Sequence, residues 1–182
     1  EGVAYRFYTT HASEMTIKNE QAEFNFSKDH AVYLPYSTND QQPLAMAFQN
    51  IYDATTLSQA ASKLAFLPVT IDYANGIKLT LLEADLENYP GMFVESQGNE
   101  HRLQGKFAPY PAKTDFYPWR QQEYVTKAED FIARTSGPRS YPWRILAITE
   151  KDTEMPVNNL VYALASPNRI GDYSWIKTGK VA

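Results

Sequence analysis

Three carboxylates stand at alternate positions in the segment 83–87, which reads Glu-Ala-Asp-Leu-Glu. The segment follows the apolar run 79–82, and strand alternation places Glu83 on the same face as Leu79 and Leu81. A carboxylate on a core-facing position is costly to bury unless a cation or hydrogen-bond donors accompany it. Calcium prefers oxygen ligands, so one interpretation of Glu83 is a calcium ligand. The other is a solvated strand end that carries charge and nothing more.

Other catalytic chemistries find little support in the residue types. The chain has no cysteine, which excludes a thiol nucleophile, a disulfide framework and a cysteine-based zinc site. Its three histidines, His11, His30 and His101, have no metal-ligand spacing. No Gly-x-Ser-x-Gly nucleophile motif is present, and the eight glycines are too scattered for a phosphate-binding loop. A glycosidase needs only two carboxylates, but among 21 acidic residues the spacing cannot select a pair.

Aromatic residues gather in a proline-rich part of the chain between residues 109 and 143. Such rings could form a platform on which sugars stack, or they could pack at the edge of a sheet or at a domain interface. Both interpretations remain open for the members of this group, which are Tyr110, Phe116, Tyr117, Trp119, Tyr141 and Trp143.

The composition is that of a folded chain with a substantial core. The 182 residues are 43% hydrophobic, 14% aromatic and 21% charged, a balance that excludes intrinsic disorder. Because 21 acidic residues face 17 basic ones, the net charge of −4 gives no sign of a nucleic-acid partner. No apolar stretch approaches the roughly 20 residues of a membrane-spanning helix. The length predicts one domain over residues 1–182, without a linker or internal repeat.

The elements that must position these residues are mainly strands. Period-2 alternation predicts about ten short strands separated by turns, without the βαβ rhythm of a parallel sheet. Asn75-Gly76 predicts a hairpin turn. The expected fold is therefore an all-β, mainly antiparallel β-sandwich with few short helices. The predicted strands cover residues 3–7, 15–17, 22–26, 30–34, 64–72 (broken at Pro68), 77–83, 92–96, 103–107, 143–150 and 160–165.

Three segments lie outside that strand pattern. Residues 109–118 carry three prolines and predict a loop. Residues 120–134 are the one stretch where a helix is expected, since Glu123, Lys127 and Asp130 have helical spacing. Residues 37–62 are rich in Gln, Asn, Ala and Thr and predict a long excursion from the sheets.

Several landmarks, taken in their order and spacing, resemble one known family across essentially the whole chain. Their combination resembles the N-terminal domain of glycoside hydrolase family 97, which comprises α-glucosidases and α-galactosidases of Gram-negative bacteria. The one departure is Thr178, where the family usually has proline. The landmarks are Gly2-Val3-Ala4-Tyr5-Arg6-Phe7, the segment from Glu83 to Met92, Pro142-Trp143-Arg144-Ile145, Asn159-Leu160-Val161-Tyr162 and the segment from Asp172 to Ala182.

This resemblance implies a galactose-mutarotase-like super-sandwich that begins partway into the family's domain and ends where a catalytic (β/α)8 barrel would start. It places the general acid and the base or nucleophile in that barrel, so no catalytic residue is expected in this chain. The resemblance also implies that a glutamate of this domain joins barrel glutamates around calcium, with Glu83 the best match and Glu87 the second.

The implied partners are the enzyme's own barrel and, through it, an α-linked oligosaccharide, and the implied location is the periplasm. A stand-alone carbohydrate-binding module that uses the aromatic group is the alternative. The sugar preference and the stereochemical course depend on barrel residues and stay open.

Overall fold

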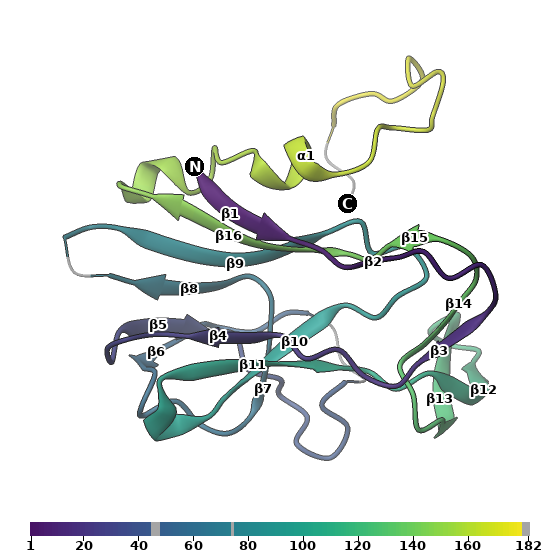
Figure 1. Cartoon of the computed structure of the whole chain (residues 1–182), viewed down its shortest axis with the longest axis horizontal. Coiled ribbons are helices and arrows are strands. Elements are labelled where there is room, and N and C mark those ends of the chain that lie inside the picture. Colours follow the sequence, from purple (N-terminus) through teal and green to yellow (C-terminus); the bar gives the residue numbers. More distant parts are fainter. Residues whose placement is uncertain (45–47, 74, 180–182) are drawn as a thin grey trace.

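The computed structural model describes residues 1–44, 48–73 and 75–179, which form antiparallel strands with little helix (Figure 1). The elements are β1 (Gly2–Tyr5), β2 (Tyr8–Thr9), β3 (Met15–Ile17), β4 (Glu23–Asn25), β5 (Ala31–Leu34), β6 (Asp53–Thr56), β7 (Leu64–Phe66), β8 (Val69–Asp72), β9 (Lys78–Ala84), β10 (Met92–Ser96), β11 (Arg102–Phe107), β12 (Pro111–Tyr117), β13 (Gln122–Ala128), β14 (Ala133–Thr135), β15 (Arg139–Ser140), β16 (Trp143–Thr149) and α1 (Leu160–Leu164), with short 3-10 turns at Gly98–Glu100 and Asp152–Glu154.

The larger sheet has six strands in the order β1-β16-β9-β8-β5-β6. Every pairing in it is antiparallel, and Figure 1 shows β1, β16 and β9 running side by side. Alternate residues of its strands, such as Val32, Ile71 and Leu81, are fully buried on one face. This alternation is the pattern that predicts a half-buried strand.

The second sheet has four strands in the order β4-β11-β10-β7, and its buried side chains share one core with those of the first sheet. Two sheets packed over a common apolar layer form the β-sandwich that the sequence predicts. Residues that meet in this layer include Phe24, Ala65, Met92, Val94 and Leu103 from the smaller sheet and Val32, Leu34, Val69, Ile71 and Leu81 from the larger one.

In the described part of the chain, three two-stranded ribbons accompany the sheets: β3 with β14, β2 with β15, and β12 with β13. The β12–β13 hairpin lies at one end of the molecule (Figure 1). Nearly all of its side chains are exposed, on both faces of the hairpin. A hairpin without a buried face is marginally stable in water.

Some sequence predictions are wrong. Residues 120–134 form no helix: they hold β13, a connecting segment and β14. The expected loop at 109–118 is largely β12, because only Pro111 falls within this strand, at its first residue and on a ribbon edge, where a missing N–H is tolerated.

Two further predictions also fail. The run 160–165 is helical (α1), not a strand; a short apolar run does not by itself distinguish the two. Within the expected excursion at 37–62, of which residues 45–47 lie outside the described part of the chain, Asp53–Thr56 form β6 and pair with β5 at the edge of the larger sheet, so the prediction fails for that strand.

The turn prediction at Asn75-Gly76 is confirmed, because both residues have positive φ angles of 80° and 84° between the antiparallel strands β8 and β9. In the part of the chain that the structure describes, no helix is long and apolar enough to cross a membrane.

Candidate functional site

Glu83 lies near the end of β9 and faces the interior, as strand alternation predicts. Its register partner across the sheet is Arg144 of β16. The Arg144 guanidinium donates from Nη1 to Oε2 of Glu83 at 2.8 Å, and the backbone N–H of Met92 donates to the same carboxylate at 3.0 Å. The Glu83 side chain retains 13% of its accessible surface. The carboxylate is therefore hydrogen-bonded on its buried side, and a small part of the Glu83 side chain reaches the surface.

Glu20 completes a buried cluster with these two residues. Arg144 donates from Nε to one oxygen of Glu20 and from Nη2 to the other, both at 2.7 Å. The side chains of Arg144 and Glu20 are 1% and 4% exposed. A forked pair of this kind is the strongest geometry for an arginine and a carboxylate. Sequence reasoning missed Glu20, because 124 residues separate it from Arg144 and no motif surrounds it.

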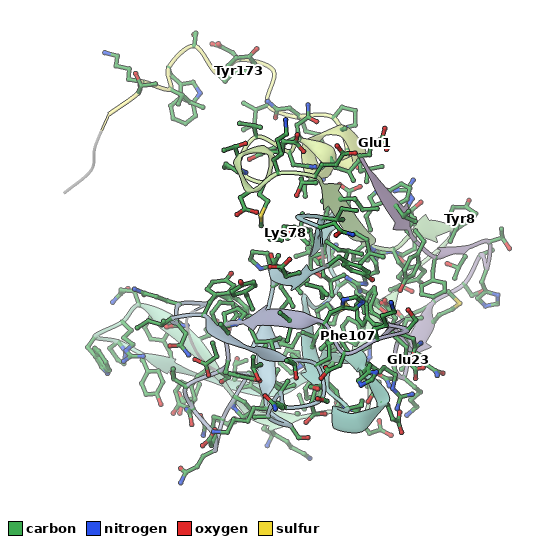
Figure 2. All side chains as sticks on the ribbon, turned by 90° about the vertical axis from the view of Figure 1, so that its left-hand side faces the viewer. Glu1, Tyr8, Glu23, Lys78, Phe107 and Tyr173 are labelled. Atoms are coloured by element: carbon green, nitrogen blue, oxygen red, sulfur yellow. The ribbon has the colours of Figure 1, made fainter. Side chains whose placement is uncertain are left out.

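Aromatic rings enclose the cluster. The Arg144 guanidinium lies 5.1 Å from the ring centre of Phe107, whose position on β11 is marked in Figure 2. Tyr89 packs against Phe107 and Tyr141. Burial, together with the negative charge of Glu20 and a hydrogen bond to it, raises the pKa of the Tyr89 phenol far above its ordinary value. The phenol is thus a neutral donor at any physiological pH.

The cluster holds one cation against two carboxylates, so its formal charge is −1. Burial raises the pKa of Glu83, although the Met92 N–H and Arg144 act in the opposite direction. An ion pair with excess negative charge in a poorly solvated place favours the approach of a further cation.

The residues present meet part of what calcium requires. Among residues 1–44, 48–73 and 75–179, no group of three or more His, Asp or Glu side chains is close enough to hold a metal ion. Glu83 nonetheless supplies a carboxylate oxygen, which is the right donor type. A Cβ added to Gly91 would lie 3.2 Å from Oε1 of Glu83, so any side chain at this position would crowd that oxygen. The donor set suits calcium, provided that other oxygens come from outside the described residues.

The other two acids of the 83–87 segment do not converge with Glu83, because β9 ends at Ala84. Asp85 has a positive φ of 60° and accepts hydrogen bonds from the backbone N–H and the hydroxyl of Ser166, at 2.8 and 3.0 Å. Glu87 is 57% exposed and pairs with Arg169. Both lie along the chain from Glu83, in a surface loop that ends at Pro90.

That loop forms one wall of a groove of about 900 Å³. The rest of the lining includes residues of β14, β15 and the base of the β12–β13 hairpin. Its polar lining includes Arg6, Arg134 and Arg139, and its aromatic lining includes Tyr110 and Tyr141. Tyr89 connects the groove to the buried cluster, since it lines the groove and also interacts with Glu20.

The aromatic group predicted as a possible platform is divided in the structure. Tyr141 is buried, and Trp143 lies under the guanidinium of Arg6 at 4.4 Å. The hairpin tip keeps an exposed set: Tyr117 stacks on Tyr124 with 4.0 Å between ring centres, and Trp119 is 73% exposed. Of the predicted group, the rings most exposed for stacking on a sugar therefore lie on the hairpin, while Tyr110, 37% exposed, lines the groove.

The last described residues present another apolar surface. Figure 2 shows the segment that carries Tyr173 standing away from the sheets. Tyr173, Trp175 and Ile176 are each more than half exposed. Exposed apolar residues in such a group are typical of a surface that contacts another protein part.

Comparison with known proteins gives consistent results. The family model described as Glycosyl-hydrolase 97 N-terminal matches residues 1–167. A retaining alpha-galactosidase of Bacteroides thetaiotaomicron is 35% identical over 189 residues; the match covers 100% of this chain and 28% of that enzyme. The chain thus spans just over a quarter of the length of this curated relative.

Solved structures show the same fold. A Glycoside Hydrolase Family 97 enzyme from Pseudoalteromonas sp. strain K8, in complex with acarbose, superposes with a TM-score of 0.72 at 22% identity and covers 97% of this chain and 24% of its own. A beta-arabinopyranosidase has a TM-score of 0.61 at 14% identity, over 82% of this chain and 24% of its own. At these identities the likeness concerns the fold alone.

Proposed function

This chain belongs to the glycosyl-hydrolase 97 N-terminal family, and from that premise we propose that it serves as the noncatalytic β-sandwich of a longer α-glycoside hydrolase. In this role it supports a catalytic (β/α)8 barrel, which binds the α-linked oligosaccharide and supplies the catalytic acid and base or nucleophile. The sandwich donates Glu83 to a calcium ion that the two domains share. The name of the Bacteroides relative makes α-galactosides the first substrate class to test, with α-glucosides second.

The buried Glu20–Arg144–Glu83 cluster is the observation that carries this proposal. Its excess carboxylate leaves Glu83 without full charge compensation inside the domain. A calcium shell needs six to eight oxygens, and the described residues gather too few of them. Ligands from a second domain would complete the shell and explain why the sandwich and the barrel occur together. When bound, calcium supplies positive charge that holds carboxylates and substrate oxygens in place.

Within this chain, each group has a defined part in the proposed role. Arg144 and the Met92 N–H hold the Glu83 carboxylate at the surface end of β9. Phe107 shields the Arg144 guanidinium from water. The groove wall at Asp85 to Pro90 and the exposed residues around Trp175 offer surfaces on which a barrel could pack.

Activity of the full-length polypeptide tests the role of the whole protein. Hydrolysis of nitrophenyl α-galactoside and α-glucoside would be measured with and without a chelator, beside the isolated chain 1–182. We expect the full-length protein to hydrolyse at least one substrate, to lose most activity on chelation and to regain it with calcium. The isolated chain should be inactive. Activity of the isolated chain, or full indifference to the chelator, would contradict the proposal.

Glu83→Gln in the full-length protein tests the ligand assignment by calorimetric calcium binding. Glutamine has nearly the same shape without the charge, so calcium affinity should fall by at least an order of magnitude. Glu87→Gln examines the second candidate in the same assay. Glu95→Gln is the matched control, because Glu95 pairs with Lys106 in the other sheet. Unchanged calcium affinity and activity in Glu83→Gln would remove Glu83 from the site.

Carbohydrate binding by the chain itself is the second candidate function. It is favoured by the hairpin tip, where the Tyr117–Tyr124 stack and Trp119 lie exposed. Calorimetry of the chain with maltooligosaccharides and galactosides tests it. Binding that disappears in Trp119→Ala but persists in Trp175→Ala would support a binding module. No binding by the unaltered chain would leave the support role as the one function.

A further inference from the structure

The two oxygens of the Glu83 carboxylate have different surroundings. Oε2 accepts from Arg144 Nη1 at 2.8 Å and from the Met92 N–H at 3.0 Å. Among the residues that the structure describes, Oε1 has only the longer contact to the same Met92 N–H, at 3.2 Å. Because each carboxylate oxygen offers about two lone-pair sites, Oε1 keeps acceptor capacity that Oε2 has largely used.

Arg144 cannot turn away from Oε2. Its Nε and Nη2 are both bound to Glu20 at 2.7 Å, and the planar guanidinium fixes the direction of the remaining Nη1 relative to that fork. The ring of Phe107 covers the guanidinium, and the side chain is 1% exposed. The two hydrogen bonds to Glu20 thus lock the orientation of the Arg144 guanidinium. The hydrogen bond from Arg144 in turn restricts rotation of the Glu83 carboxylate.

Gly91 lies beside Oε1 of Glu83. A Cβ at this position would stand 3.2 Å from Oε1 of Glu83, closer than ordinary van der Waals contact. The left-handed backbone that demands glycine occurs at Gly76, Gly98 and Gly137, and Gly91 is not one of them. Gly91 therefore lacks a side chain directly beside Oε1, although its backbone conformation does not require a glycine.

We infer that Arg144, locked by Glu20, is a positioning residue that holds Oε2 of Glu83 and leaves Oε1, beside Gly91, as the oxygen that ligates calcium. This inference rests on the proposed function, in which Glu83 is the calcium ligand. It adds the atom that binds, the two residues that orient it and the glycine that leaves room for the ion. Groups that orient a metal ligand in this way affect affinity without touching the metal.

Calcium titration calorimetry of the chelator-treated full-length polypeptide tests this inference. Two variants address separate parts of it: Arg144→Lys keeps the charge but loses the fork, and Gly91→Ala keeps every charge but crowds Oε1. We expect each to weaken calcium binding by roughly 10- to 100-fold, the usual effect of disturbing a residue that orients a ligand. The matched controls are Arg102→Lys, at an ion pair of the other sheet, and Gly171→Ala, where a Cβ has no neighbour within 4 Å. Both controls should bind calcium like the unaltered protein.

A purely structural role for Arg144 gives a different result. The melting temperature of the calcium-free protein would then fall in Arg144→Lys while its calcium affinity stayed unchanged, and the positioning role would be overturned. Unchanged affinity in Gly91→Ala would overturn the assignment of Oε1. Should Arg144→Lys not fold, Gly91→Ala still decides whether the site lies beside Oε1, and Glu20→Gln then tests the lock.

Failure of the inference and failure of the proposed function give separate patterns. When Glu83→Gln loses calcium but Arg144→Lys and Gly91→Ala bind it normally, Glu83 remains the ligand and only the positioning scheme is wrong. When Glu83→Gln itself binds calcium like the unaltered protein, the calcium role of Glu83 fails, and the inference fails with it.

Discussion

Glu83 and Arg144 are direct partners in the antiparallel register of β9 and β16, and their side chains meet at 2.8 Å on the inner face of the larger sheet. Charged cross-strand pairs usually lie on the solvent face, where they contribute little. Here the same arginine also serves Glu20, which precedes β4 of the other sheet. One cation therefore links the larger sheet to the segment that leads into β4 of the smaller one.

Removal of that cation should be costly. Arg144→Met leaves two buried carboxylates without their partner, so the free energy of unfolding should drop by about 3–5 kcal/mol. In Arg102→Met the lost ion pairs are partly exposed, and the drop should stay within about 1 kcal/mol. Urea unfolding of both variants measures the difference. Equal losses in the free energy of unfolding would show that burial of the Arg144 cluster does not raise the cost of removing the arginine.

The shared core predicts a second contrast. Leu81 is fully buried between the sheets, so Leu81→Ala should lower the free energy of unfolding by about 2–5 kcal/mol. Leu86, five residues along, is 45% exposed, and Leu86→Ala should stay within about 0.5 kcal/mol. The same urea experiment applies. A comparable loss at both positions would argue against the core as described.

Close packing between β11 and the segment before β4 predicts a third effect. A Cβ on Gly105 would lie 2.9 Å from the Cβ of Ala22 and 3.2 Å from the sulfur of Met92. Gly105→Ala should therefore overpack the core and cost about 1–3 kcal/mol. Gly171→Ala, which meets no neighbour, serves as the control in thermal unfolding. A gain in stability from Gly105→Ala would contradict this prediction, because it would mean that β11 and the segment before β4 have room for the added methyl group.

Acid conditions should reveal the contact between Asp29 and Ser58. The hydroxyl and the backbone N–H of Ser58 donate to the Asp29 carboxylate at 2.6 and 2.9 Å and hold the pKa of Asp29 below its ordinary value. A pKa lowered by folding stabilises the folded state above the unfolded-state pKa, and that stabilisation disappears as the pH falls through the folded-state pKa.

The comparison is therefore between the unaltered chain and Ser58→Ala over a range of pH. The unaltered chain should be the more stable of the two at neutral pH, and the difference should shrink below about pH 4. Unfolding measured at each pH supplies the curve. A difference that stays constant into strong acid would exclude ionisation of Asp29 as its source.

The sequence predicts the sandwich strands well because their alternation reflects burial on one face. Residues 15–17 and 92–96 form strands with the predicted bounds. The β12–β13 hairpin escapes detection for the opposite reason: both of its faces are exposed, so no alternation is present. Its prolines and the chance helical spacing of Glu123, Lys127 and Asp130 then predict the wrong structure.

Only part of the candidate site can be predicted from the sequence. Glu83 stands out because a carboxylate continues the apolar face of a strand, and that pattern is local. The contact between Glu20 and Arg144 forms only when segments 124 residues apart pack together. Local sequence patterns do not encode that packing. Gly91 lies inside the recognised 83–92 landmark, but its relation to Oε1 emerges only from the folded positions of both residues.

The pairing of β1 with β16 and of β16 with β9 has a consequence for synthesis of the protein. The ribosome delivers Glu20 and Glu83 long before the strand that carries Arg144. Until then both acids would have to be buried without their cation, which strongly disfavours closure of the two layers. The sandwich should thus remain open on a nascent chain and close when β16 emerges. Arg144 would then make closure of the sandwich depend on the synthesis of β16.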